Sequence, residues 1–175
     1  SYTSIKANAH ALARYAALCQ DEDIVPIVEP EVLMDGDHDI EVCYDVTEAT
    51  LRSLFGALYE HNILLEGTIL KASMVISGKD CPDQAPADEV AEATLRCLKA
   101  SVPAILPGIV FLSGGQSDES ATANLNVMNT MGPHPWPLSF SYGRALQASA
   151  LQAWGGDTAR AEAAQAAFVH RARMN

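Results

Sequence analysis

The stretch Glu66-Gly67-Thr68-Ile69-Leu70-Lys71 decides the fold, because in it an apolar run ends on a lysine. Residues 63–65 are Ile-Leu-Leu, and with Ile69 and Leu70 they form a near-continuous hydrophobic segment. Such a segment is typical of a strand buried on both faces of a parallel sheet. We therefore expect a strand over residues 63–70. The Lys71 amine at its end should be poorly solvated, and poor solvation lowers the pKa of an amine.

Three other short apolar runs end on polar residues in the same way. They are residues 24–28 before Glu29-Pro30-Glu31, residues 109–112 before Ser113, and residues 138–142 before Gly143-Arg144. Glu29, Lys71 and Ser113 stand 42 residues apart, and Arg144 follows 31 residues later. Each interval fits one strand, one helix and two loops. The sequence thus predicts an α/β fold with a four-stranded parallel sheet, at whose carboxyl edge these polar residues gather.

Helices are expected between the strands from apolar periodicity and capping residues. In chain order they cover residues 3–20, 46–61, 88–100, a segment opening at 118, residues 144–154 and residues 158–174. Asp45 is the expected N-cap of the second helix, where Glu48 completes a capping box. Ser117 is the expected N-cap of the fourth. The arginines of the alanine-rich last helix are expected to be exposed: Arg160, Arg171 and Arg173.

Composition excludes several classes of protein. With 175 residues, 49% of them hydrophobic, the chain suits a single domain over residues 1–175. A net charge of −11 disfavours nucleic acid or an anionic membrane as a partner, because both attract clustered Lys and Arg. No apolar segment reaches the ~18 residues of a membrane span, and the N-terminus lacks a signal-peptide pattern. We therefore expect a cytoplasmic protein.

Two groups of residues suggest metal or disulfide chemistry only weakly. Cys19, Cys43, Cys81 and Cys97 are widely separated, which favours buried reduced thiols over disulfides or a zinc site. The segment Asp35-Gly36-Asp37-His38-Asp39 offers metal-ligand chemistry, but its order does not fit an EF-hand, and Asp and Gly are ordinary turn formers. We expect a turn and no metal.

The segment Ser113-Gly114-Gly115-Gln116-Ser117 is a candidate phosphate site. Paired glycines let backbone N–H groups turn toward an anion, and a helix start adds positive potential. A Gly-Gly pair is also common in plain turns. An eight-stranded barrel often holds phosphate in the loops after its last two strands. Because such a barrel takes about 250 residues, this chain would supply its second half and leave two sheet edges open.

Six motifs together resemble class I fructose-bisphosphate aldolase from end to end. They are residues 11–16 (ALARYA), 25–31 (VPIVEPE), 35–39 (DGDHD), 65–71 (LEGTILK), 111–117 (FLSGGQS) and 140–149 (FSYGRALQAS). The resemblance implies a (β/α)8 TIM barrel, usually a homotetramer. It implies glycolytic cleavage of fructose 1,6-bisphosphate to dihydroxyacetone phosphate and glyceraldehyde 3-phosphate, with no cofactor.

The same resemblance implies roles for seven residues. Lys71 looks like the Schiff-base lysine, Glu29 like the acid/base of the imine steps, and Glu31 stands beside it. The cradle for the ketose 1-phosphate looks like Ser113, Gly114, Gly143 and Arg144. The implied chemistry agrees with the residues, because a desolvated amine is a nucleophile toward a carbonyl. A protonated imine then draws electrons from the breaking carbon–carbon bond, so the reaction needs no metal.

Departures from the family pattern leave alternatives open. The lysine motif usually continues with Pro-Asn, whereas Ala72-Ser73 follow here. The family's N-terminal half is absent, with an acid/base aspartate, two active-site lysines and most of the 6-phosphate site. So is its C-terminal tail, which ends in tyrosine. One alternative is a non-catalytic half-barrel that binds sugar phosphates or proteins. Another is a different Schiff-base lyase on the same barrel, and a lone lysine at a barrel mouth can also simply reach solvent.

Overall fold

The computed structural model describes all of residues 1–175. Helices and short strands alternate along most of the chain. In order, the elements are α1 (Tyr2–Asp21), β1 (Ile27–Val28), α2 (Ile40–Glu60), the 3-10 turn η1 (Leu65–Gly67), β2 (Ile69–Ala72), α3 (Ala87–Ser101), β3 (Ile109–Phe111), α4 (Asp118–Thr130), β4 (Leu138–Phe140), α5 (Arg144–Trp154), the 3-10 turn η2 (Thr158–Arg160) and α6 (Ala161–Met174).

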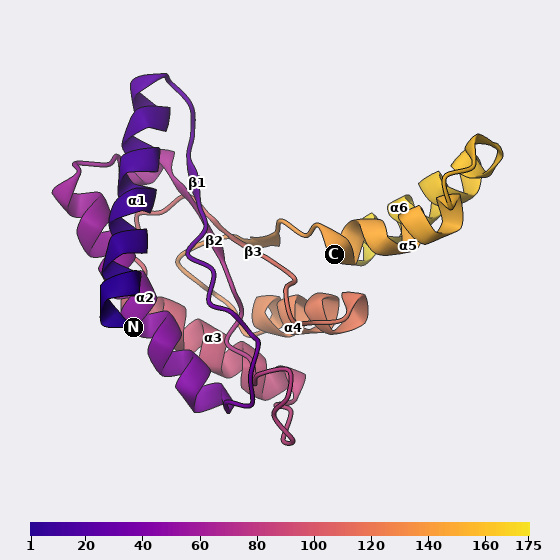
Figure 1. Ribbon diagram of the computed structural model, residues 1–175, viewed down its shortest axis with the longest axis horizontal. Coiled ribbons are helices and arrows are strands. Elements are labelled where there is room, and N and C mark those ends of the chain that lie inside the picture. The colour runs from indigo at the N-terminus through magenta and orange to yellow at the C-terminus, as the bar shows by residue number, and fades with distance from the viewer.

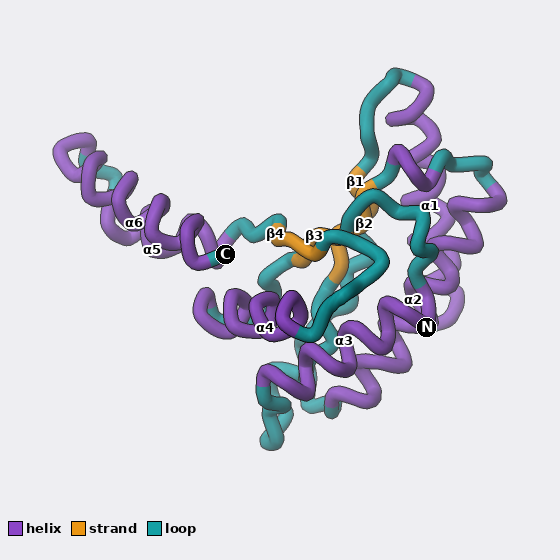
Figure 2. Tube along the Cα trace, turned by 180° about the vertical axis from the view of Figure 1, so that it is seen from behind, coloured by secondary structure: helices purple, strands orange, loops and turns teal.

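The four strands form one parallel sheet whose spatial order follows the chain, β1-β2-β3-β4. Val28 pairs with Leu70, Leu70 with Ile109, and Ile109 with Leu138, so the strands stand in a common register. The predicted α/β fold with four β/α units is therefore confirmed. Figures 1 and 2 show helices α2, α3 and α4 following one another along one side of the sheet, with α1 beside α2.

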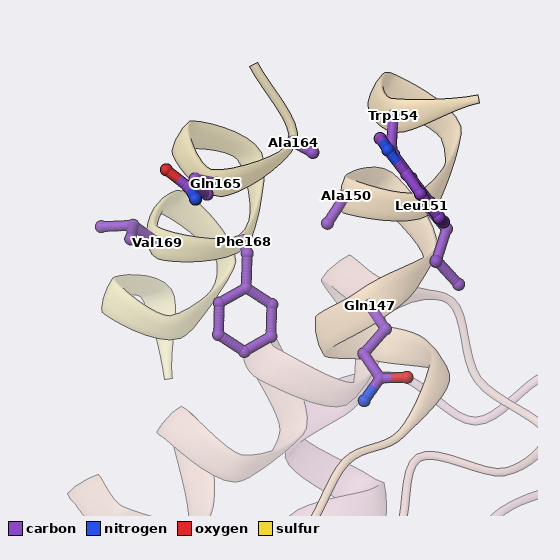
Figure 3. Close-up of a pocket in the computed structure, with 8 residues that line it drawn as sticks. All are labelled: Gln147, Ala150, Leu151, Trp154, Ala164, Gln165, Phe168 and Val169. Atoms are coloured by element: carbon purple, nitrogen blue, oxygen red, sulfur yellow. The ribbon is translucent and has the colours of Figure 1, made fainter. Parts of the chain in front are cut away.

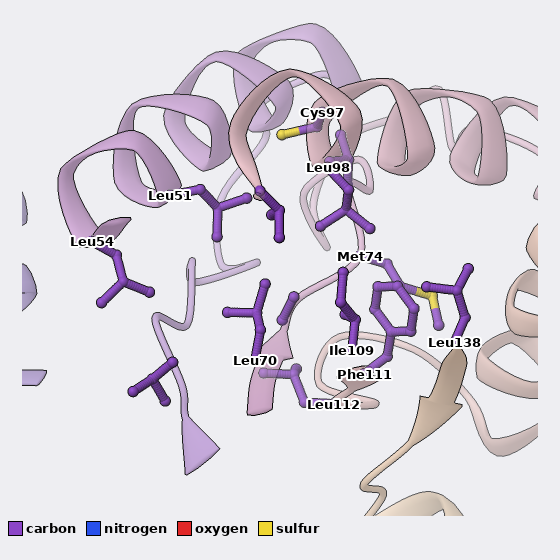
Figure 4. Packing of buried hydrophobic residues seen from close by; sticks show 14 of the residues in the cluster. Leu51, Leu54, Leu70, Met74, Cys97, Leu98, Ile109, Phe111, Leu112 and Leu138 are labelled. Carbon is purple, nitrogen blue, oxygen red and sulfur yellow. The ribbon is translucent and has the colours of Figure 1, made fainter. Parts of the chain in front are cut away.

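The core lies between the sheet and these helices. Leu70, Ile109 and Phe111 point from the strands toward Leu54 of α2 and Leu98 of α3, as Figure 4 shows, and each is 1% exposed or less. Alternation along a strand sends every second side chain to this face. The apolar sides of the amphipathic helices α2 and α3 pack against this face of the sheet.

The other face of the sheet is open. Ile27, Ile69, Lys71, Val110 and Ser139 alternate with the core residues, and none of them is buried. Ile27 keeps 43% of its surface exposed. The expectation that the central strand is buried on both faces is thus wrong for this chain, because only one face has helices packed against it.

All four strands end or begin inside the predicted runs, because β3 stops at Phe111 and β4 at Phe140, and the first two strands start later than predicted. Residues 24–26 lie outside β1, since the Ile24 N–H bonds to the Cys19 carbonyl and completes the C-terminal turn of α1. Residues 63–68 lie outside β2, because Leu65–Gly67 form a 3-10 turn. The Gln20 side chain holds that turn: its amide oxygen accepts the Leu64 N–H at 3.0 Å, and its amide nitrogen donates to the Leu64 carbonyl at 2.9 Å. Lys71 consequently lies inside β2 instead of after it.

Helix α2 begins six residues earlier than the predicted Val46. Its N-cap is Asp39, whose Oδ1 accepts the Val42 N–H at 2.9 Å, and the predicted N-cap Asp45 is an exposed residue inside the helix. Glu48 forms an ion pair with Arg52 at 2.8 Å in place of a capping box. The predicted N-cap Ser117 of α4 is confirmed, with its hydroxyl accepting the Ser120 N–H at 3.0 Å.

Helices α5 and α6 form a hairpin that projects past β4, away from the rest of the molecule (Figure 1). Gly155 ends α5 in the left-handed conformation, directly after the predicted last residue Trp154. An apolar hollow of about 360 Å³ lies between the two helices, where Figure 3 shows Trp154 of α5 and Phe168 of α6. Its lining carries no titratable side chain.

The cysteines, the arginines of the last helix and the apolar character of the helices can each be compared with what the sequence predicts. All four cysteines are free, with Cys43, Cys81 and Cys97 buried and Cys19 partly so. Arg171 is only 7% exposed, so the expectation that all three arginines of the last helix face solvent is wrong for this one. None of the helices combines the length and the apolar character that crossing a membrane would require.

Candidate active site

Lys71 and Glu29 meet on the open face of the sheet. The Lys71 Nζ lies 2.9 Å from Glu29 Oε1, and their side chains keep 21% and 41% of their surface exposed. Glu29 directly follows β1 and stands opposite Lys71, because Val28 pairs with Leu70 in the parallel register. The interval of 42 residues thus brings a carboxylate to an amine. This pair holds an amine where a base can take its proton.

Glu31 lies against the glycine loop, residues 113–117 after β3. It is exposed, and its Oε1 lies 3.4 Å from the point where a Cβ on Gly114 would be. Glu29 and Glu31 also line a groove of about 870 Å³ between α1, α2 and the segment after β1. Ser73 anchors that segment, because its hydroxyl accepts the Val32 N–H at 3.2 Å. Ser73 therefore ties the segment that carries the two glutamates to the strand of Lys71.

The loop after β3 is shaped by its glycines. Ser113 is buried at the end of the strand, and its carbonyl accepts the Gln116 N–H at 3.2 Å. Gly115 has φ +78°, and a Cβ there would lie 2.3 Å from the Met34 Cγ. A Cβ on Gly114 would lie 2.7 Å from the Met34 Cε. A larger residue is excluded at Gly115, whereas at Gly114 the flexible end of Met34 would have to move; Met34 thus packs directly against the backbone of the loop.

Gly143 and Arg144 lie at the start of α5, beyond the neighbouring strand β4. The Gly143 carbonyl accepts the N–H groups of Leu146 and Gln147, and both Gly143 and Arg144 are exposed. Because Phe111 pairs with Phe140, the segments that follow these two residues leave the same edge of the sheet. The structure therefore brings the predicted phosphate residues to adjacent strand ends, one strand (Ser113, Gly114) and two strands (Gly143, Arg144) from Lys71.

The acidic segment 35–39 acts as a turn and a cap. Asp39 caps α2, and Asp35 pairs with Lys79 at 3.0 Å. The Gly78 N–H donates to the His38 carbonyl at 2.8 Å, which fastens the segment to the loop after β2. No group of three His, Cys, Asp or Glu side chains stands close enough together to hold a metal ion.

Sequence reasoning missed Met34, Tyr142 and Arg171 as supports of this site. The buried Tyr142 hydroxyl donates to the Ala121 carbonyl of α4 at 2.8 Å. Burial raises the pKa of Tyr142 well above its usual range, while the positive charge of Arg171 lowers it in part. Arg171 donates to backbone carbonyls of both α4 and α5. Tyr142 stands inside the 140–149 motif, and nothing in the sequence marks the other two.

Comparison with known proteins identifies the chain's relatives. The family model "Fructose-bisphosphate aldolase class-I" matches residues 1–175. A probable fructose-bisphosphate aldolase class 1 from Xanthomonas campestris is 69% identical over 176 residues, which cover 100% of this chain and 53% of that protein. Human fructose-bisphosphate aldolase B is 56% identical, with 100% of this chain and 48% of that protein covered.

A solved structure agrees with these sequences. The fructose-bisphosphate aldolase of Plasmodium falciparum, crystallised with TRAP and a small-molecule inhibitor, superposes with a TM-score of 0.98 and is 50% identical. The match covers 100% of this chain and 50% of that one, and the chain spans about half the length of the curated relatives named above. It belongs to the class I fructose-bisphosphate aldolase family, and it carries four of the eight β/α units of that family's barrel.

Proposed function

We propose that this chain supplies the Schiff-base half of an aldolase that cleaves fructose 1,6-bisphosphate. The observation that carries the proposal is the 2.9 Å contact between Lys71 Nζ and Glu29 Oε1 on the uncovered face of the sheet. Family membership supports the substrate, and the proposal requires no metal or other cofactor. We propose as well that residues 1–175 act as one domain. We propose that the enzyme acts in glycolysis in the cytoplasm. We propose that it is a homotetramer, as is usual in the family.

In this mechanism Lys71 is the nucleophile and Glu29 moves the protons. Glu29 takes a proton from the amine, and Lys71 Nζ adds to the C2 carbonyl of the ketose. Protonation by Glu29 lets the carbinolamine lose water and become a protonated imine. The imine accepts the electron pair of the C3–C4 bond when the C4 hydroxyl gives up its proton, and glyceraldehyde 3-phosphate leaves. Protonation at C3 and hydrolysis then release dihydroxyacetone phosphate and restore the amine.

The phosphate on C1 is proposed to bind Ser113, Gly114, Gly143 and Arg144. Backbone N–H groups of a glycine loop and a guanidinium both favour a phosphate dianion. We expect Arg144→Ala to weaken dihydroxyacetone phosphate by roughly 1.5–3 kcal/mol, the worth of a hydrogen bond to a charged group. Unphosphorylated dihydroxyacetone should be little affected. Equal losses for both ligands would show that Arg144 is structural.

Borohydride trapping tests the nucleophile. In the complete barrel that carries this chain, reduction in the presence of dihydroxyacetone phosphate should leave a stable adduct on the peptide containing Lys71. Lys71→Arg should abolish the adduct and the cleavage of fructose 1,6-bisphosphate. Lys79→Arg is the matched control, because Lys79 is exposed and paired with Asp35 away from Glu29. Labelling of another lysine would show that Lys71 is not the nucleophile, and turnover that survives Lys71→Arg and stops with a chelator would point to a metal-dependent reaction.

A further inference from the structure

Arg171 is a buried cation without a carboxylate partner. Its Nε donates to the Ala145 carbonyl at 3.1 Å, and its Nη2 donates to the Asp118 carbonyl at 2.6 Å and to the Thr122 hydroxyl at 2.8 Å. All three acceptors are neutral, and none of the four ion pairs of the chain includes Arg171. A buried charge without a counter-ion is costly to the fold.

Two of the three acceptors lie at the starts of the two helices that follow the candidate phosphate segments, and Thr122 lies one turn into α4. Asp118 is the first residue of α4, directly after Ser117, and Ala145 directly follows Arg144 in α5. One planar guanidinium thus joins α4 to α5. The Tyr142 hydroxyl bonds to the Ala121 carbonyl and makes a second link between the same regions.

The position of the charge also favours an anion. The N–H groups at the starts of α4 and α5 create positive potential, which the Asp118 and Glu119 side chains in the first turn of α4 offset in part, and the buried Arg171 adds a further positive charge beside them. An anion bound in front of both helices stabilises the helix starts and the guanidinium together. Arg144 is exposed and free to contact such an anion, whereas Arg171 is buried and its side chain bonds only to α4 and α5.

We propose that Arg171 is a positioning residue for the substrate phosphate. It holds residues 113–117 and Gly143-Arg144 at a fixed separation, and its charge raises the affinity of the cradle without touching the ligand. This inference rests on the proposed function and concerns the phosphate part of the site. Arg171 thus has a role in phosphate binding, whereas Lys71 and Glu29 act on the carbonyl.

Borohydride trapping with two ligands tests the inference in the complete barrel. The half-saturating concentrations of dihydroxyacetone phosphate and of unphosphorylated dihydroxyacetone are measured for wild type, Arg171→Met and Arg171→Lys. We expect Arg171→Met to raise the value for the phosphate at least tenfold and the value for dihydroxyacetone less than twofold. Lysine keeps the charge but loses the planar fork, so Arg171→Lys should raise the phosphate value about threefold.

Arg173→Met is the matched control, because Arg173 is exposed on the same helix, and it should change neither value. If Arg171→Met does not fold, the threefold, phosphate-specific effect of Arg171→Lys carries the test. Equal changes for the two ligands in either variant, or none, would show that Arg171 only stabilises the fold and would overturn the inference. Two results for the wild-type enzyme would instead overturn the proposed function: an adduct on another lysine, or equal half-saturating concentrations for dihydroxyacetone phosphate and dihydroxyacetone.

Discussion

Gly115→Ala tests whether the phosphate loop depends on close packing against Met34. The added Cβ would stand 2.3 Å from the Met34 Cγ, 2.8 Å from its Cβ and 3.1 Å from the Ile76 Cδ1. Its φ of +78° costs an alanine about 1–2 kcal/mol. Crowding in a packed region costs a further ~1–3 kcal/mol. We expect the free energy of unfolding to fall by about 2–5 kcal/mol in total.

A double-mutant cycle separates the two costs. Urea unfolding is compared for wild type, Gly115→Ala, Met34→Ala and the double variant. Because Met34→Ala removes the 2.3 Å contact but keeps the Cβ at 2.8 Å, the double variant should be more stable than the two separate losses predict, by about 1–2 kcal/mol. The left-handed backbone conformation of residue 115 should still lower the free energy of unfolding of the double variant by about 1–2 kcal/mol. A single variant within about 0.5 kcal/mol of wild type, or two losses that simply add, would refute the packing argument.

Three other predictions concern stability and assembly. Gly56→Ala in α2, where a Cβ would meet no atom within 4 Å, should stabilise the fold by about 0.5–1 kcal/mol in urea unfolding, and a loss would contradict the open site. Burial raises the pKa of the Cys97 thiol from 9.0 to about 12, so the folded state keeps its proton while the unfolded state ionises above pH 9. That stabilisation is complete below pH 9 and disappears toward pH 12. The loss of unfolding free energy caused by Cys97→Ala should therefore shrink by about 1.4 kcal/mol between pH 7 and pH 10. A loss that stays constant with pH would argue against the raised pKa of Cys97. Residues 1–175 alone should self-associate in sedimentation, because β1 and β4 each leave an unpaired edge; a monodisperse monomer that unfolds cooperatively would be the contrary result.

Much of the fold was predictable because its signals are local. The strand ends recur at regular intervals, Ser117 caps α4, and Gly155 ends α5 in the left-handed region that glycine favours. The meeting of Glu29 and Lys71 was predictable too, since equal spacing in parallel units puts residues at equal height. The start of α2 was not, because Asp39 and Asp45 are equally good caps and only packing of the first turn selects between them.

The supports of the site were unpredictable for a different reason. Arg171 bonds to main-chain carbonyls 26 and 53 residues away, and every residue type offers such a carbonyl. Met34 supports the glycine loop through shape alone, and its sequence neighbours do not indicate what it will contact. The sequence therefore revealed side chains whose chemistry is unusual. It did not reveal those whose importance comes from where the backbone of a distant segment passes.

The sheet order β1-β2-β3-β4 has a consequence for synthesis on the ribosome. Each strand pairs only with the strand before it and the strand after it, so every emerging unit finds its partner already made. No strand must wait for a segment from the far end of the chain, and the loops to be closed stay short. The sheet can grow during translation by adding one unit at a time. At each stage two edges are unpaired, the outer edge of β1 and the edge of the newest strand, so the risk of misassembly lies at these two places.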